Sequence, residues 1–301
     1  MTEARLAASP TPARARLSGA TVALILLLCA GWGGLAPAIK IGLRELPPIA
    51  LAAWRFLFSL AAVAAWCWLR RVPVAPGAGR TGYLGLLSAT FVLQIILLNA
   101  GARTTSGGHA ILLLSTHPLF VALLAHFALR GDRLTAPKVV GLLVALAGIA
   151  AVVSERLSGG SLAGDSLVLA SALTLGVLVT LTKRGMERGM TAYQLLLWQM
   201  FPGVPAYFLL SRLVEGPLAL PQGAAVWGSL LYQGLVVGGF CFVAWNRLLE
   251  RYPASQLTAF QFTTPIYGVL FSALILGDPL TGGVVLGTLL VGAGLILANR
   301  G

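Results

Sequence analysis

Hydrophobic and polar positions alternate along the chain in long blocks. Apolar runs without a charged residue cover 20–39, 82–102, 104–129, 139–153, 166–182, 189–211, 216–246, 252–277 and 279–299, and a further run, 49–69, is interrupted only by Arg55. Most are close to the roughly 20 residues with which a helix crosses about 30 Å of hydrocarbon. The pattern predicts an all-α membrane protein with ten transmembrane helices.

One stretch of the chain occurs twice. Residues 131–148 read GDRLTAPKVVGLLVALAG and residues 277–294 read GDPLTGGVVLGTLLVGAG, and nine positions coincide without a gap. In both copies a Gly-Asp turn follows an apolar run and precedes a glycine-punctuated helix. Internal repeats dictate architecture, so this match predicts a duplicated helical unit. The competing explanation is that glycine-rich apolar helices match through composition.

The match extends upstream of the Gly-Asp turn. The aligned pairs are Pro118 with Pro265, Asn99 with Asn246, Lys40 with Lys183, Trp54 with Trp198, and Arg55 with Gln199. We therefore expect a first five-helix unit over 20–153 and a second over 164–299, preceded by a basic, proline-containing cytoplasmic arm over 1–19. A cleaved signal peptide is the alternative for the N-terminus. We reject it because the run 20–39 is long enough to be the first span.

Five spans per unit is an odd number, which makes the second unit enter the membrane from the opposite side. The fold expected is thus two inverted five-helix repeats, a recurrent design of secondary transporters with a midplane site. Basic residues sort accordingly, because the segments predicted to face the cytoplasm hold 15 Lys and Arg and those on the other side hold five: Lys40, Arg44, Arg103, Arg156 and Arg212. This bias predicts that both termini are cytoplasmic.

Composition supports a bilayer protein. The chain is 57% hydrophobic and 10% charged, with a mean hydropathy of +0.88 and nine acidic residues among 301. The net charge of +12 does not indicate nucleic acid, because the basic residues are spread among short loops and do not alternate with aromatic residues in a patch. Cys29, Cys67 and Cys241 lie within predicted spans without ligand spacing and are expected to be core residues.

Several of these features together resemble a known family. They are the WGG segment at 32–34 with a lysine shortly after it, the Trp-Arg-Phe of 54–56, the central prolines followed by a Gly-acid-x-Leu-Thr turn, and the glycine-rich last helix. The chain resembles the EamA-type branch of the drug/metabolite transporter superfamily over nearly all of 20–299. It departs from that pattern in having Asp132 and Asp278 where glutamate is usual. Its length and ten-span plan are similar to the aromatic amino acid and methionine exporters, although no short motif fixes the substrate.

The two prolines mark the expected site. Pro118 and Pro265 fall near the centres of their spans, where each removes a helical hydrogen bond, and freed carbonyls at this depth are tolerated beside a polar cavity. We expect these kinked helices to face each other across a substrate cavity. The candidate substrate-binding residues are Trp32, Gln94, Thr116, His117, Trp198, Tyr232, Gln233, Gln261 and Thr264. For any single threonine, a hydroxyl bonded to its own helix is the alternative.

Three ionisable residues are further candidates for the functional site, whereas no acidic residue is. His117 lies near mid-membrane and is either a functional group or a neutral donor to a helix carbonyl. Lys40 and Arg55 either snorkel toward the outer surface, or they make gating contacts or attract a carboxylate. All nine acids fall in tails, loops or helix ends, so we expect no buried carboxylate, and we expect His109 to be solvated at an external edge. This weakens a proton-coupled exporter of cationic drugs.

The sequence hypothesis is therefore a bacterial-type inner-membrane exporter of amino acids or similar small metabolites, which works by alternating access, is monomeric and uses no cofactor. No phosphate-binding loop, metal-ligand cluster or nucleophile and base pair is visible. A drug or nucleotide-sugar carrier is the alternative within transporters. An intramembrane lipid-modifying enzyme, or a structural or sensory membrane protein, is the alternative outside them.

Overall fold

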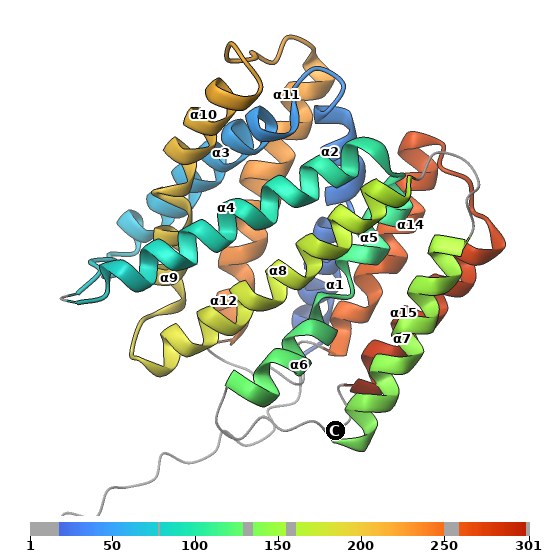
Figure 1. The fold of residues 1–301 in the computed structure, drawn as a ribbon. Helices are drawn as coiled ribbons and strands as arrows, with labels where there is room; N and C mark the ends of the chain where they lie inside the picture. The colour runs from blue at the N-terminus through green and yellow to red at the C-terminus, as the bar shows by residue number, and fades with distance from the viewer. Residues whose placement is uncertain (1–17, 78, 129–134, 155–160, 250–258, 299–301) are drawn as a thin grey trace, which may run out of the picture.

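The computed structural model describes residues 18–77, 79–128, 135–154, 161–249 and 259–298. Every regular element in these ranges is helical. Most of the predicted N-terminal arm lies outside them, and so does Asp132 of the first Gly-Asp turn. Figure 1 shows the helices packed side by side in a bundle, with most connections at its two ends.

The first half of the chain forms seven helical pieces. They are α1 (Gly19–Gly33), α2 (Leu35–Gly42), α3 (Pro48–Leu69), α4 (Thr81–Thr104), α5 (Gly107–Leu114), α6 (His117–Ala128) and α7 (Ala136–Ser154). Hydroxyl side chains cap two of their starts: Ser18 accepts from the backbone N–H of Thr21, and Ser106 accepts from that of His109. Such a cap satisfies one of the N–H groups that have no partner within the helix.

The described part of the second half is also helical. It forms α8 (Leu162–Glu187), α9 (Ala192–Met200), α10 (Gly203–Val214), α11 (Ala224–Leu231), the π-helix η1 (Tyr232–Cys241), α12 (Phe242–Leu249), the 3-10 turn η2 (Ala259–Phe262), α14 (Thr263–Leu276) and α15 (Gly282–Ala298). The break between α9 and α10 and the π-helix were not predicted. Pro202 lies in the break between α9 and α10, and this proline could have predicted the break.

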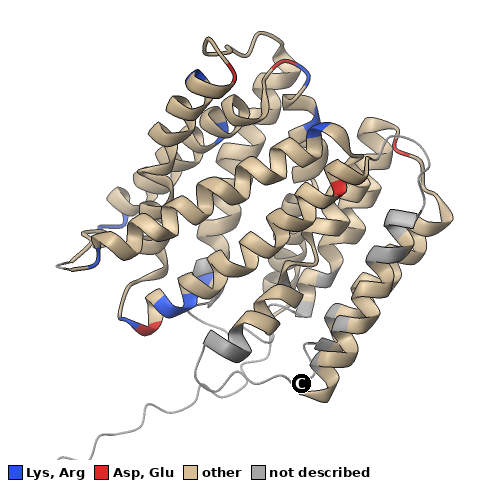
Figure 2. Ribbon diagram, viewed as in Figure 1, with Lys and Arg blue, Asp and Glu red and all other residues tan. Residues whose placement is uncertain are grey.

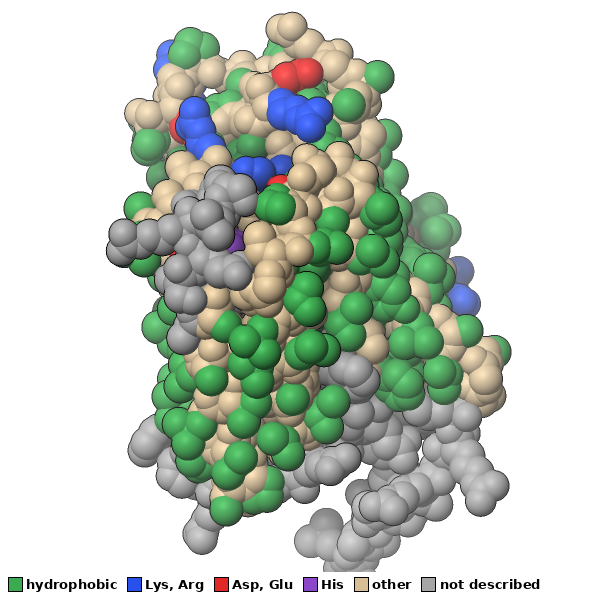
Figure 3. Space-filling model, turned by 90° about the vertical axis from the view of Figure 1, so that its right-hand side faces the viewer, with side chains coloured by type: hydrophobic (Ala, Val, Ile, Leu, Met, Phe, Trp, Pro, Cys, Tyr) green, Lys and Arg blue, Asp and Glu red, His purple; other side chains and the backbone are tan. Residues whose placement is uncertain are grey.

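Within the residues that the structure describes, five helices are long and apolar enough to cross a membrane: Gly19–Gly42, Pro48–Leu69, Thr81–Thr104, Leu162–Glu187 and Ala224–Trp245. The other predicted spans correspond to shorter or interrupted helices, so ten spans stay a prediction. The lateral surface is also apolar. Large hydrophobic side chains such as Leu143, Leu274 and Leu289 are more than half exposed, and Figure 3 shows hydrophobic side chains over most of the face that carries α7 and α15. An aqueous protein does not expose apolar patches of this extent.

The duplicated stretch forms a pair of helices in contact. α7 packs along α15 at one edge of the bundle (Figure 1). A Cβ atom added at Gly148 would lie 3.0 Å from the carbonyl oxygen of Gly287, and one added at Gly294 would lie 2.5 Å from that of Gly141. In the alignment of the two copies, Gly148 corresponds to Gly294 and Gly141 to Gly287. The contact is therefore reciprocal, and glycine at these positions allows the two backbones to approach closely.

Charged residues gather at the two ends of the bundle (Figure 2). We call one the Glu45 end, where α2 leads into α3, α4 into α5, α10 into α11 and α14 toward α15. The other is the Arg80 end, where α3 leads into α4 and α8 into α9. Described basic residues at the Glu45 end are Lys40, Arg44, Arg103 and Arg212, and those at the Arg80 end are Arg70, Arg71, Arg80, Lys183, Arg184, Arg188 and Arg247.

A carboxylate ties two connections together at the Glu45 end. Glu45 accepts hydrogen bonds from the backbone N–H of Gln222 (2.9 Å) and from that of Gly223 (2.9 Å). These two donors lower the pKa of Glu45 because they favour its ionised form. The contact joins the α2–α3 connection to the start of α11, and so joins the two halves of the chain.

Candidate functional site

A buried carboxylate lies near the Glu45 end. Asp165, in the first turn of α8, is 6% exposed. The hydroxyl of Thr105 donates to its Oδ1, and Nδ1 of His109 lies 3.2 Å from its Oδ2. The prediction that no carboxylate is buried was therefore wrong. Asp165 does lie at a helix end, as predicted, but neighbouring helices cover that end.

His109 was also placed wrongly by the sequence analysis. It was expected to be solvated, yet it is 5% exposed. Because Ser106 caps α5, residue 109 falls within the first helical turn, where its ring meets α8 and not water. The contact with Asp165 gives each of these buried polar side chains a partner, which offsets the cost of burying them.

Two further polar contacts surround this pair. The Nζ of Lys40, at the end of α2, donates to the carbonyl oxygen of Thr105 over 2.7 Å. The carboxylate of Asp278, after α14, accepts from the backbone N–H of Gly108 over 3.0 Å. We call Lys40, Thr105, His109, Asp165 and Asp278 the end network. It joins the first half of the chain to the second.

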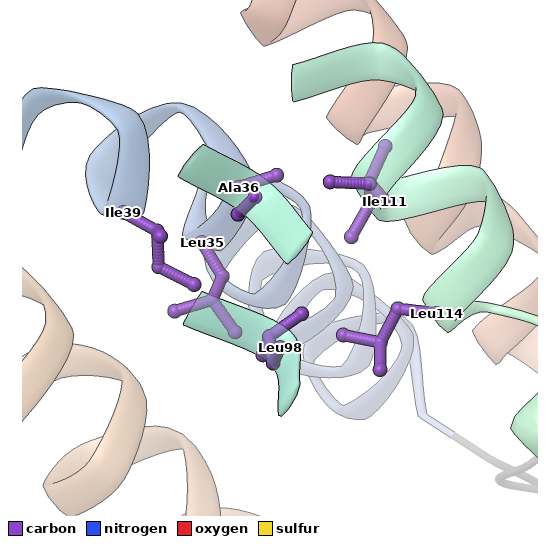
Figure 4. Close-up of a pocket in the computed structure, with 8 residues that line it drawn as sticks. Leu35, Ala36, Ile39, Leu98, Ile111 and Leu114 are labelled. Atoms are coloured by element: carbon purple, nitrogen blue, oxygen red, sulfur yellow. The ribbon is translucent and has the colours of Figure 1, made fainter. Parts of the chain in front are cut away.

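The helices next to the end network enclose little space. A small cleft there admits a water-sized sphere over only about 10 Å³ and is lined by Leu35, Ala36 and Ile39 of α2, Leu98 and Ala102 of α4, and Ala110, Ile111 and Leu114 of α5 (Figure 4). This is at the lower limit of the volume that holds one water molecule. The contact of α2, α4 and α5 is therefore apolar and closed.

A larger groove opens at the Arg80 end. It has a volume of about 640 Å³ and is lined by Ala64, Cys67, Trp68, Leu69, Arg71, Val72, Val74 and Leu197. None of the predicted substrate-binding residues lines it, but Trp198 lies beside it, since its Nε1 donates to the carbonyl oxygen of Val74 over 2.7 Å. Trp198 thus anchors the segment that follows α3.

The two proline-containing helices are interrupted and pack together. α5 ends before Ser115 and α6 begins at His117, so Pro118 lies in the first turn of α6, as Pro265 does in α14. A Cβ atom added at Gly268 of α14 would lie within 3.0 Å of the side chain of Ile111 of α5. The two helices face each other as expected, but they do so in direct contact at this point.

Two polar side chains at the interruption before Pro118 bond to the preceding helical turn. The hydroxyl of Thr116 donates to the carbonyl oxygen of Leu113 (2.6 Å), and Nδ1 of His117 lies 3.1 Å from that of Leu114. These are the local bonds considered as alternatives to ligand contacts. Gln261 and Thr264 are partly buried, and the carbonyl oxygen of Thr264 lies against Gly33 of α1.

Three predicted residues meet along α1 and α2. The hydroxyl of Tyr232 donates to the carbonyl oxygen of Gly31 (2.6 Å). The Nε2 of Gln233 donates to the carbonyl oxygen of Ala38 (3.2 Å), while the buried Oε1 of Gln233 has no partner. Trp32 packs edge-on against Trp245 and Phe242. The structure thus places these three residues and Thr264 along α1 and α2. Among them, Trp32 and Tyr232 pack against the same apolar cluster.

Gln94 is separate from that group. Its Nε2 donates to Ser171 Oγ over 2.8 Å, and the Ser171 hydroxyl donates to the backbone carbonyl oxygen of Gln94 over 2.9 Å. This reciprocal pair locks α4 to α8, which lie side by side (Figure 1). The amide is thus used in helix packing in this conformation.

Arg55 does not snorkel. Its side chain lies within the bundle and the residue is 3% exposed. Its guanidinium carbon lies 4.5 Å from the centre of the Phe56 ring, and its Nε and Nη1 have no hydrogen-bond partner. Of the two ionisable residues assigned to gating, Lys40 thus belongs to the end network and Arg55 to the interior of the bundle.

A bundle of long apolar helices with an apolar lateral surface defines a multi-pass membrane protein. The chain belongs to the EamA-like transporter family, which it matches twice, over residues 19–154 and 162–300. It is thus a membrane transporter of that family, as its resemblance implied.

Curated relatives agree with this assignment over most of their length. A protein of Escherichia coli (strain K12) named "Probable amino-acid metabolite efflux pump" is 28% identical over 284 residues, which cover 91% of this chain and 93% of that protein. A protein of Streptantibioticus cattleyicolor named "Probable terminal-alkyne amino-acid exporter" is 29% identical over 290 residues, or 95% of each chain. A solved crystal structure with 19% identity shares the fold, with a TM-score of 0.71 over 93% of this chain and 97% of that one.

Proposed function

We propose that the protein exports amino acids or similar small metabolites by alternating access through a central cavity. The observation that carries this proposal is the end network, which connects the two halves of the chain at one end of the bundle. Contacts of this kind are needed only while that end is closed, and alternating access requires each end to close in turn. The names of the two relatives support amino acids as the substrate class.

The same proposal includes the membrane topology. We infer ten spans, two inverted five-helix units over 20–153 and 164–299, and cytoplasmic termini in a bacterial-type inner membrane. The excess of described Lys and Arg at the Arg80 end supports a cytoplasmic position for that end. The Glu45 end, with the end network, is then the external gate. A single chain of ten helices suffices to enclose a cavity, so we propose a monomer.

The binding cavity is proposed to open between the interrupted helices. In our proposal Trp32, Tyr232, Gln233 and Thr264 form its wall along α1, and Thr116, His117 and Gln261 contribute from the interruptions next to Pro118 and Pro265. Gln94 and Trp198 are proposed to join only after α4 and α9 move. The unpartnered Oε1 of Gln233 supports this assignment, because a buried acceptor without a donor is suited to a ligand.

Counterflow in liposomes tests the function directly. Proteoliposomes are loaded with an unlabelled solute, and uptake of labelled amino acids is followed with a panel of drugs, nucleotide sugars and other metabolites as competitors. Saturable exchange of amino acids, absent from empty liposomes, is the expected result. Exchange of a drug or nucleotide sugar without amino-acid exchange would retain the transporter and overturn the substrate class. No exchange of any solute would overturn transport by this site.

A further inference from the structure

Arg55 is a buried cation, and two of its three side-chain nitrogens have no hydrogen-bond acceptor. It lies on α3, seven residues after Pro48, which places it about 10 Å along the helix at 1.5 Å per residue. It is 3% exposed, and Nε and Nη1 are buried without an acceptor. Arginine stays protonated in proteins, and an isolated buried charge costs several kcal/mol. A group of this kind needs an anionic partner.

The immediate surroundings of Arg55 are aromatic. Phe56 presents its ring to the guanidinium, and Phe56, Phe91 and Tyr207 pack together with ring centres between 4.6 and 6.2 Å apart. The hydroxyl of Tyr207 is the electrostatic neighbour of Arg55, but it donates its hydrogen to the carbonyl oxygen of Phe91 over 3.2 Å. The aromatic rings offset part of the cost of burying the Arg55 charge, but they supply no negative charge.

The acids that the structure describes are engaged elsewhere or lie at the surface. Asp165 and Asp278 belong to the end network, and Glu45 binds the start of α11. Glu215 accepts from the backbone N–H groups of Ile49 and Ala50 at the start of α3, while Glu187 is exposed at the end of α8. Among the described residues, therefore, no acid serves as the counterion of Arg55.

We propose that Arg55 binds the carboxylate of the transported solute. A guanidinium N–H donates a charge-assisted hydrogen bond to a carboxylate oxygen, and such bonds are about twice as strong as those between neutral groups. The proposal rests on the proposed function and names the chemical group that this site recognises. Because Arg55 is buried, a solute reaches it only in a conformation in which α3 separates from α4 or α10, which alternating access provides.

The duplication gives the carboxylate site a direction. In the alignment of the two halves Arg55 corresponds to Gln199, which is neutral, 8% exposed and accepts from Ser88 through its backbone carbonyl oxygen (3.0 Å). Only the first half thus offers a cation at this position. A solute with one carboxylate would bind with that group toward α3, and its other end would face the second half.

The decisive experiment compares pairs of solutes that differ only in the carboxylate. Counterflow is measured in proteoliposomes for several amino acids and for their amides and decarboxylated amines. In the wild-type protein the half-saturating concentration of each amino acid is expected to be at least about tenfold lower than that of its amide, since hydrogen bonds to a charged group contribute about 1.5–3 kcal/mol. Arg55→Gln should raise the value for amino acids to that for amides and leave the amides unchanged.

Matched variants separate binding from folding. Arg103→Gln removes an exposed arginine at the end of α4 and should change neither class of solute. Arg55→Lys keeps the charge without the planar fork and should restore part of the preference. Each variant is first checked for a monodisperse elution profile in detergent. If Arg55→Gln does not fold, the preference for amino acids over their amides in the wild-type protein and in Arg55→Lys still tests whether Arg55 binds the carboxylate.

The outcomes distinguish this inference from the function on which it rests. If amino acids and their amides exchange equally well in the wild-type protein, transport stands and carboxylate binding by Arg55 is overturned. If exchange of amides depends on chloride in the buffer, Arg55 holds a resident inorganic anion, which also overturns the proposal. If no solute exchanges at all, the proposed function itself fails.

Discussion

The Nδ1 of His109 and the Oδ2 of Asp165 lie 3.2 Å apart and connect α5 of the first half of the chain to the first turn of α8 in the second. Both side chains are more than 90% buried. Removing one partner of such a pair leaves the other polar group buried without it, which typically costs about 1–3 kcal/mol in the conformation that contains the pair. In the proposed mechanism, the pair would thus favour the closed state of the Glu45 end.

Asp165→Asn is expected to open that end more often. The amide keeps the shape of the carboxylate but removes its charge, so the closed state loses stability relative to the open one. The measurement is the rate at which a membrane-impermeant maleimide labels Ala102→Cys, which lies in the closed apolar cleft, in a background without Cys29, Cys67 and Cys241. We expect the rate to rise about tenfold, the effect of roughly 1.4 kcal/mol.

Glu187→Gln is the matched control for Asp165→Asn. Glu187 is an exposed acid at the other end of α8, so its neutralisation changes the charge equally without touching the end network. The labelling rate should stay at the wild-type value in this variant. Equal rates in Asp165→Asn and the wild-type protein would show that the pair does not hold the gate.

Glu45 gives a pH-dependent prediction. Its pKa is lowered in the folded protein by the N–H groups of Gln222 and Gly223, so it binds its proton more weakly when folded than when unfolded. Its contribution to stability is therefore present above the unfolded pKa of about 4.3 and is lost as pH falls through the lower folded value. Glu45→Gln should lower the unfolding temperature in detergent at pH 7, with a difference that shrinks toward pH 3.

The close approach of α7 and α15 at their glycines can be tested with two substitutions on α15. Gly294→Ala would place a Cβ atom 2.5 Å from the carbonyl oxygen of Gly141 and 2.7 Å from the backbone nitrogen of Ala145, whereas nothing lies within 4 Å of a Cβ atom at Gly292. Because backbone cannot yield as a flexible side chain does, Gly294→Ala should destabilise by about 1–3 kcal/mol. Gly292→Ala should be neutral or stabilising by up to about 1 kcal/mol. Thermal unfolding in detergent measures both, and equal unfolding temperatures would exclude the close contact.

The predictable part of the fold was the part encoded in contiguous residues. The apolar run 82–102 became α4, and the prolines at 118 and 265 follow interruptions of their helices because proline disrupts the preceding turn whatever surrounds it. The π-helix at Tyr232–Cys241 was missed. Its glycines permit α3 to pack closely, since a Cβ atom at Gly234 would lie 2.9 Å from the carbonyl oxygen of Arg55, and this is a tertiary relationship.

The polar sites were predicted less well for a related reason. His109 and Asp165 are 56 residues apart, and each alone is a polar residue at the end of an apolar run, where contact with water is the normal expectation. Only the packing of α5 against α8 buries them together. Arg55 was singled out because it interrupts an apolar run, yet nothing local showed whether its side chain turns to the surface or to the interior.

Gln94 offers the clearest test between packing and ligand binding. In this conformation its Nε2 donates to the Ser171 hydroxyl, which in turn donates to the backbone carbonyl oxygen of Gln94. Gln94→Met should therefore remove one hydrogen bond to a buried hydroxyl and cost about 0.5–1.5 kcal/mol of stability. The double variant Gln94→Met/Ser171→Ala should recover much of that loss, because both polar partners are then removed. If Gln94 only locks α4 to α8, the half-saturating concentration in counterflow will stay unchanged in the double variant. An increase of tenfold or more at restored stability would instead place Gln94 in the binding cavity, as the sequence predicted.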